Sequence, residues 1–218
     1  MTQFWSDVAV YGPGFLKASW AVLWITVLTI LVSWVCGLAA ALAQRSALAP
    51  VRGLANFYIW FIRGTPALIQ IFIIYFGMPQ LGIRLSPYTA GVLALGINSG
   101  AYVAEIIRAG LQAIPKGQME SSLALGFSSR QTMQSIILPQ VFRIILPAVT
   151  NEAISTLKNT SLLSTITVVE LTLYAQTLIS ATFRPFDFYI AVAVIYLVLT
   201  TVLTQLASWL ERRYGRLS

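Results

Sequence analysis

The stretch QMESSLALGFSSRQTMQSIILPQVFRIILP, which runs from Gln118 to Pro147, is a polar segment with a central glycine in an otherwise apolar chain. The whole chain is 57% hydrophobic and only 10% charged, and its mean hydropathy is +0.78. This composition is far too apolar for a soluble domain and places the chain in a lipid bilayer. The quoted stretch is therefore expected to be a cytosolic excursion between membrane spans.

Long charge-free runs predict those spans. No charged residue lies between Lys17 and Arg45 or between Asp187 and Glu211, and a bilayer core of about 30 Å takes roughly 20 helical residues. Because backbone amides in hydrocarbon need internal partners and the runs do not alternate, helices are favoured over a barrel. We predict an all-α membrane protein, one transmembrane domain over 1–218, with five spans near 19–43, 54–80, 88–109, 142–166 and 188–210.

The Lys and Arg residues of the short loops predict the orientation. The cations expected on one side are Arg45, Arg52, Lys116, Arg130, Arg143, Arg212, Arg213 and Arg216. The opposite side has Lys17, Arg84 and Arg184, partly offset by Asp7 and Asp187. The positive-inside rule then places the N-terminus outside and the C-terminus in the cytoplasm. The cations are scattered at membrane edges rather than gathered on one soluble face, so no nucleic-acid partner is expected.

Residues for catalysis are missing from the sequence. It has no histidine, seven carboxylates and one cysteine, Cys36, which lies in the first expected span. No zinc set, Cys–His pair, Ser-His-Asp triad or Walker phosphate loop can be assembled. We therefore expect no catalytic residue, metal site or cofactor in this chain, and any uphill transport must draw on a partner or an ion gradient. The first apolar run is longer than a secretory signal and lacks a basic start, so it is expected to stay as a span.

Short-range signals in the polar segment predict its local structure. Pro115 can open a helix, and Gly126 can supply the left-handed residue that ends it. Ser128 or Ser129 can then cap a second short helix. Such a rigid knob suits docking into a groove on a soluble subunit, and the alternative is an amphipathic loop in the membrane interface. Its apolar residues are Met119, Leu123, Leu125 and Phe127.

One pattern in this segment carries a resemblance. Glu120, Gly126, Ile136, Leu138 and Pro139 match the spacing E-A-A-x(3)-G-x(9)-I-x-L-P. This resembles the coupling-loop signature of importer-type ABC transporter permeases. Ser121 and Ser122 stand where the family usually has two alanines, and since both are small, close packing is expected to be kept.

Further motifs resemble the polar amino acid permeases, such as the glutamine, arginine, histidine and cystine types. The resemblance extends from about residue 56 to residue 213. The matching segments are 63–66 (RGTP), 101–108 (AYVAEIIR), 114–118 (IPKGQ), 158–162 (KNTSL) and 170–172 (ELT).

The resemblance implies a type I ABC importer-like transmembrane domain in a bacterial inner membrane. It implies a second permease chain, identical or a sister, two cytosolic ATPase subunits that hold ATP and Mg, an extracytoplasmic solute-binding protein and an amino-acid substrate. The coupling loop would be 111–139. Its contact residues would be Glu120, Ser121, Ser122, Ala124, Gly126 and Phe127. An ion-coupled secondary transporter is the alternative, although such folds usually carry an internal repeat, and none is visible here. A channel or membrane scaffold, the other alternative, would require no docking knob.

Polar residues within the expected spans are candidates for the substrate path, because charge in hydrocarbon normally faces water or a bundle interior. Glu170 can meet a substrate ammonium, while Gln70 and Asn98 can either bind substrate or hold helices together. Asn151, Ser155 and Lys158 share one face of the fourth expected span. Glu152, Thr156 and Asn159 share the adjacent face, and this broad stripe either lines a cavity or joins helices. The candidate path residues are Gln70, Asn98, Lys158, Ser161 and Glu170.

Other residues are expected to shape the bundle. Glu105 and Arg108 are three apart on one helix and predict a stabilising ion pair. Pro66 removes a helical hydrogen bond and predicts a kink or hinge. Pro139, at the end of the coupling pattern, is assigned the same architectural role.

Overall fold

Helices are the only regular secondary structure in the computed structural model, which describes the backbone of residues 2–214 and the side chains of residues 7–214. Arg216, counted above among the cytosolic cations, lies outside the described residues. The longer helices are α1 (Thr2–Gln44), α2 (Ala49–Arg63), α4 (Pro87–Gln112), α7 (Leu138–Asn159) and α9 (Pro185–Tyr214). The shorter ones are α3 (Ala67–Phe72), η1 (Ile73–Gly77), η2 (Met78–Leu81), α5 (Lys116–Ala124), α6 (Ser129–Thr132), η3 (Met133–Ile137), η4 (Thr160–Ile166) and α8 (Leu171–Thr182).

Four helical stretches of the described chain are long and apolar enough to cross a membrane, which confirms the all-α membrane fold. They are Asp7–Gln44, Pro87–Gln112, Ser129–Ile166 and Pro185–Tyr214. They contain the spans expected near 19–43, 88–109, 142–166 and 188–210. Each stretch is longer than its apolar run, because helical backbone bonding continues into the flanking polar residues.

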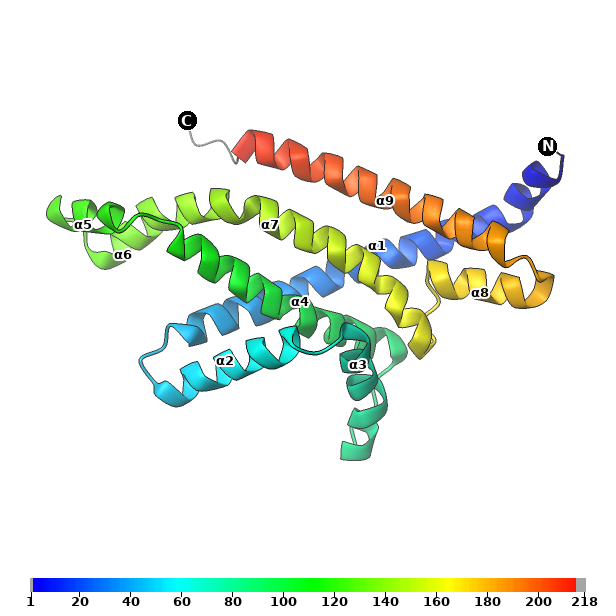
Figure 1. Ribbon diagram of the computed structural model, residues 1–218, viewed down its shortest axis with the longest axis horizontal. Coiled ribbons are helices and arrows are strands. Elements are labelled where there is room, and N and C mark those ends of the chain that lie inside the picture. The colour runs from blue at the N-terminus through cyan, green and yellow to red at the C-terminus, as the bar shows by residue number, and fades with distance from the viewer. Residues whose placement is uncertain (1, 215–218) are drawn as a thin grey trace.

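The second expected span, near 54–80, is broken rather than straight. α2 and the helical turns over Ala67–Leu81 meet at 111°, so they make a fifth span only if the two arms are taken together. Gly64 ends α2, and Pro66, whose nitrogen carries no hydrogen, stands in extended conformation just before α3. The sequence predicted a kink at Pro66, and the structure shows a complete break. Figure 1 shows α3 running at a steep angle to α2.

The packing of α1 against α4 forms the centre of the bundle. It depends on two glycines of α4 that are four residues apart. A Cβ at Gly96 would lie 2.6 Å from Val32 Cβ, and one at Gly100 would lie 2.7 Å from Cys36 Cβ. Small residues at this spacing let two membrane helices approach closely.

The bundle has two distinct ends (Figure 1). α5 and α6 lie at one end, which we call the hairpin end, and α8 lies at the other. At the α8 end, Arg184 pairs with Asp7 at 2.8 Å and with Asp187 at 2.7 Å. These ion pairs tie the start of α9 to the first turns of α1.

Candidate functional site

The polar segment folds as a helical hairpin with a left-handed corner at Gly126. α5 follows Pro115 and ends at a glycine whose φ is +88°. Phe127 N donates to Ser122 O at 3.1 Å and Gly126 N donates to Leu123 O at 3.0 Å, which is the Schellman pattern that closes a helix. The predicted helix, glycine corner and second helix are confirmed. Pro115 differs slightly, since it precedes the first helical residue instead of being that residue.

Ser128 begins the second arm of the hairpin. Its Oγ accepts a hydrogen bond from Gln131 N at 3.3 Å, while Gln131 Oε1 accepts one from Ser128 N at 2.9 Å. This reciprocal capping box satisfies two backbone donors that would otherwise be free. The hairpin is therefore fixed on both sides of its corner by short-range bonds. The segment named here the coupling knob is Lys116–Thr132, covering α5, the corner and α6.

The coupling knob presents apolar side chains to the outside. Leu125 is 78% exposed, Leu123 45% and Phe127 40%. Met119 instead packs against the cluster around Ile137 and Val141, which anchors the knob to the start of α7. One side of the knob is thus packed against the start of α7, and its other side carries the exposed apolar side chains.

The predicted coupling residues divide by exposure. Glu120, Ser121, Ala124, Gly126 and Phe127 are exposed. Ser122 is only 2% exposed, and its Oγ donates to Gln118 O at 2.6 Å. Because its hydroxyl is satisfied within α5, a serine can replace a small apolar residue here without leaving a buried polar group unpaired. Pro139 lies in the first turn of α7, just after the π-helical turn η3.

A charged network links α2 to α4. Glu105 accepts two hydrogen bonds from Arg108, at 2.9 and 2.8 Å, so the predicted ion pair is present. Arg63 adds a third charge 3.3 Å from the same carboxylate, and its guanidinium lies 5.5 Å from the centre of the Tyr102 ring. The sequence gave no sign of this third partner, because Arg63 is 42 residues away from Glu105. A cavity of about 540 Å³ opens beside the network.

Gln70 and Asn98 meet at the break between α2 and α3. Gln70 Nε2 donates to Ile62 O at 2.8 Å and to Thr65 O at 3.1 Å, and Asn98 Nδ2 donates to Gln70 Oε1 at 2.9 Å. Both side chains are buried. Gln70 therefore satisfies carbonyls that the broken helix leaves free, and Asn98 joins α4 to Gln70. Both bonds favour a helix-joining role for the two amides over a substrate-binding one.

The polar stripe of α7 separates into two faces. On one face, Glu152 Oε1 accepts a bond from Ser99 Oγ at 2.8 Å, and Thr156 Oγ1 donates to the same Ser99 Oγ at 3.3 Å. That face joins α7 to α4 through Ser99, a residue the sequence analysis missed because a single serine in a span carries no signal. On the other face, Asn151 and Lys158 are exposed, so this face remains the candidate to line a path. Ser161, half-buried in η4, donates to Lys158 O at 2.8 Å.

Glu170 is enclosed rather than open to a cavity. It is 0% exposed, and its carboxylate caps α8 by accepting bonds from Thr172 N and Leu173 N, both at 2.9 Å. Tyr196 Oη donates to the same carboxylate at 2.9 Å. The expectation that Glu170 faces the path is corrected on this geometry. The sequence alone did not separate a helix cap from a ligand, because both use a carboxylate near a helix start.

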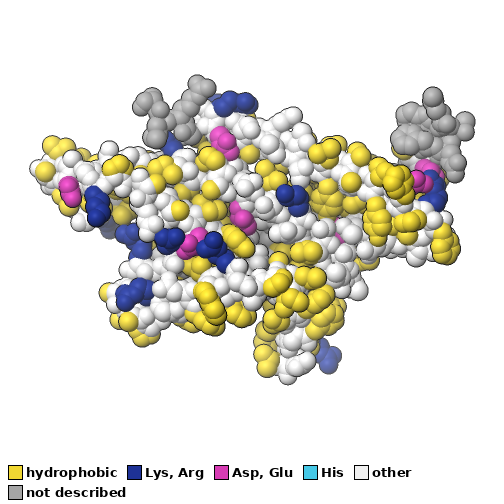
Figure 2. Space-filling view, viewed as in Figure 1, with side chains coloured by type: hydrophobic (Ala, Val, Ile, Leu, Met, Phe, Trp, Pro, Cys, Tyr) yellow, Lys and Arg dark blue, Asp and Glu magenta, His cyan; other side chains and the backbone are white. Residues whose placement is uncertain are grey.

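Most of the positive charge on the visible face lies at the hairpin end. Figure 2 shows most of the Lys and Arg side chains over the half of the molecule that carries α5 and α6. Apolar side chains are spread over the whole visible face, including both ends (Figure 2). The fold and the knob together define a class of protein, a multi-pass helical membrane protein with an exposed helical hairpin at one end.

The comparisons place the chain within that class. It belongs to the family of the binding-protein-dependent transport system inner membrane component, whose profile matches residues 33–216. The resemblance to importer-type ABC permeases is thereby confirmed. The chain is a transmembrane subunit of a transport system.

Two relatives match over nearly the whole length. The chain is 40% identical over 211 residues to the glutamine transport system permease protein GlnP of Escherichia coli (strain K12), with 96% of each chain covered. It is 38% identical over 207 residues to the probable glutamine ABC transporter permease protein GlnM of Bacillus subtilis (strain 168), covering 95% of this chain and 94% of that protein.

Solved structures agree with the type I importer-like fold. The structure described as an amino acid ABC transporter with histidines matches with a TM-score of 0.90 at 42% identity, over 95% of this chain and 97% of that chain. An inward-facing structure of the MetNI methionine ABC transporter matches with a TM-score of 0.76 over 92% and 96%. At 18% identity the second likeness shows the fold alone.

Proposed function

We propose that this chain is the permease subunit of an ATP-driven importer of polar amino acids in a bacterial inner membrane. The single observation that carries the coupling role is the coupling knob, rigid at Gly126 and apolar at Leu125. Two cytosolic ATPase subunits, which hold ATP and Mg, dock on it. A second permease chain completes the path, and an extracytoplasmic binding protein delivers the substrate. The names of the glutamine relatives support the substrate class.

The coupling knob can move the path because it connects two helices that are joined elsewhere. α4 leads into the knob and α7 leads out of it. The same two helices are joined through Ser99, Glu152 and Thr156, and Gly110 of α4 lies directly against Ile145 of α7. A displacement of the knob is therefore transmitted to both helices as a unit. Alternating access follows when this unit tilts against the rest of the bundle.

Lys158 is the path residue that the exposure supports best. An exposed ammonium group on a membrane helix needs water or an anion nearby, and no ion pair of Lys158 is present among residues 7–214. It can meet the carboxylate that every amino-acid substrate carries. Lys158→Met should lower uptake at least tenfold while the complex and its basal ATP hydrolysis persist. The matched control is Lys17→Met, also exposed, and equal uptake by both variants would remove Lys158 from the path.

Co-purification tests the class of transporter. A tagged chain extracted in mild detergent should bring down an ATPase subunit in equal amount, and ATP should stimulate uptake in vesicles without an ion gradient. An ion-coupled secondary transporter would purify without an ATPase and lose uptake when the gradient is dissipated. The latter pair of results would overturn the proposal.

The proposed orientation places the hairpin end in the cytosol and the α8 end outside. Ser129 and Ser180 are both exposed and lie at opposite ends. In a chain with Cys36→Ser, a cysteine replacing Ser180 should react with an impermeant thiol reagent in intact spheroplasts. A cysteine replacing Ser129 should react only after the membrane is opened. The reverse pattern would invert the topology.

A further inference from the structure

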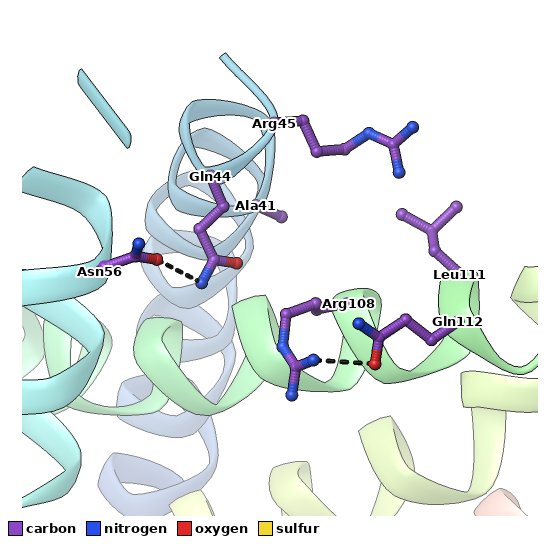
Figure 3. Close-up of a pocket in the computed structure, with 7 residues that line it drawn as sticks. All are labelled: Ala41, Gln44, Arg45, Asn56, Arg108, Leu111 and Gln112. Carbon is purple, nitrogen blue, oxygen red and sulfur yellow. Dashed lines mark hydrogen bonds between the residues drawn. The ribbon is translucent and has the colours of Figure 1, made fainter. Parts of the chain in front are cut away.

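At the hairpin end, α1, α2 and α4 line a cavity of about 320 Å³. No residue of the coupling knob and no candidate path residue lines it. Figure 3 shows its lining, which comes from three helices. A cavity of this size falls at the lower end of the range for small-ligand sites. The polar residues that line it are Gln44 at the end of α1, Arg45 just after it, Asn56 of α2, and Arg108 and Gln112 of α4.

Two hydrogen bonds between lining residues leave donor groups free to face a bound molecule. Gln44 Nε2 donates to Asn56 Oδ1 at 3.1 Å, and Arg108 Nη1 donates to Gln112 Oε1 at 2.8 Å (Figure 3). Each bond occupies the amide oxygen of the accepting residue. The amide nitrogens of Asn56 and Gln112 are therefore available to donate to a bound group.

The charge around the cavity is positive. Arg45 is exposed and forms no ion pair within residues 7–214. Arg108 shares the carboxylate of Glu105 with Arg63, at 2.8 and 3.3 Å. Arg45 and Arg108 line the cavity itself, and Arg63 and Glu105 lie beside it, so these three guanidinium groups and one carboxylate leave a formal local charge of +2. Guanidinium forks and amide donors together are the chemistry that recognises a phosphate oxygen.

We propose that this cavity binds the phosphate of an anionic phospholipid headgroup. Basic pockets between membrane helices on the cytoplasmic side bind such headgroups. Leu42 is 71% exposed, Leu48 66% and Leu54 71%, all at the same ends of α1 and α2. These leucines offer a surface for acyl chains, and a free phosphate would leave them uncovered. The inner-leaflet location rests on the orientation proposed above, while the headgroup contact itself does not depend on transport.

Arg45→Gln and Arg52→Gln make a matched pair for the test. Arg52 is also exposed, lies in the first turn of α2 and donates to Ser46 O at 3.1 Å, outside the cavity. The assembled complex is purified from membranes and its bound phospholipids are quantified by mass spectrometry. We expect phosphatidylglycerol per complex to fall at least threefold in Arg45→Gln and to stay at the wild-type level in Arg52→Gln. Equal retention, or equal loss, in the two variants would overturn the proposal.

Competition identifies the source of the phosphate. The delipidated complex is placed in phosphatidylcholine nanodiscs and titrated with fluorescent phosphatidylglycerol, with and without excess inorganic phosphate. We expect binding that inorganic phosphate does not displace. Displacement by inorganic phosphate would identify a free-anion site and contradict the lipid assignment. A photo-crosslinker at Leu111 that reaches only a protein subunit would contradict it as well.

Discussion

Two of the helix breaks that carry a glycine differ in their surroundings, since one lies inside the bundle at Gly64–Pro66 and the other in the coupling knob at Gly126. At the first, a buried side chain closes the broken helix end, since Gln70 donates to Ile62 O and Thr65 O. At the second, the backbone closes its own end through bonds from Gly126 N and Phe127 N. The environment decides the difference. A free carbonyl in hydrocarbon must find a protein donor, whereas one in water does not.

Closure by the backbone alone leaves the apolar side chains of the knob available for binding a partner. Because its backbone needs no side chain to close it, Leu123, Leu125 and Phe127 remain outward and exposed. At the inner break, the Gln70 amide bonds through both its nitrogen and its oxygen, Asn98 donates to that oxygen, and both side chains are buried. The inner interruption is therefore part of the scaffold, and the outer one is the proposed docking surface. Substitutions at the two places should fail in different ways.

Gln70→Leu should have the largest effect. It removes the amide nitrogen that bonds Ile62 O and Thr65 O, and it leaves Asn98 without its acceptor. Losing these buried hydrogen bonds should lower the free energy of unfolding by about 2 to 4 kcal/mol. Gln80→Leu is the matched control, because Gln80 is exposed in η2. The purified variants are heated, and the fraction of protein that stays monodisperse is then measured by size-exclusion chromatography. Equal survival of the two variants would contradict the scaffold role.

Gly126→Val should leave folding intact and abolish coupling. A β-branched residue in the left-handed region costs roughly 1–2 kcal/mol, so the corner should open locally. We expect uptake and substrate-stimulated ATP hydrolysis to fall together, at least tenfold, in protein that still inserts. Gly117→Val is the control, since a side chain there meets no atom within 4 Å and the φ of Gly117 is not positive. Wild-type coupling in Gly126→Val would refute the role of the corner.

Glu170→Gln should have the smallest effect and extends the comparison to a third helix end. Glutamine keeps one acceptor oxygen for the α8 cap and loses the other, so stability should fall by about 1 kcal/mol. Uptake per assembled complex should stay near the wild-type value, measured together with complex yield on one preparation. A tenfold drop in uptake with normal assembly would return Glu170 to the substrate path.

The sequence predicted the coupling knob because its signals are local. Pro115, Gly126 and Ser128 each set the backbone within a few residues, and the structure bears out the helix, corner and helix that they predict. The long charge-free runs likewise located the spans near 19–43, 88–109 and 188–210, whereas Glu152 and Lys158 interrupt the span near 142–166. What decides the rest lies far apart in the chain. Enclosure of Glu170 requires Tyr196, which is 26 residues away.

The break at Pro66 shows the same limit. A proline in a helix predicts a kink, but at the observed bend of 111° Gln70 donates to the free carbonyls of the broken helix and Asn98 holds the Gln70 amide in place. Asn98 belongs to another span, and its direction toward Gln70 is set by the packing of α4. Residue spacing along one span carries no information on such a partner. The two amides were accordingly interpreted as candidates for substrate contact.

A photo-crosslinking amino acid in place of Leu125 tests the docking role of the coupling knob most directly. Irradiated membranes should yield a product that joins this chain to a nucleotide-binding subunit recovered on an ATP resin. The same probe in place of Phe183, which is 86% exposed at the opposite end, should not yield it. A crosslink to the nucleotide-binding subunit from Leu125 alone is the predicted result. No such product from Leu125, or the same product from Phe183, would contradict the assignment of the knob as the ATPase contact.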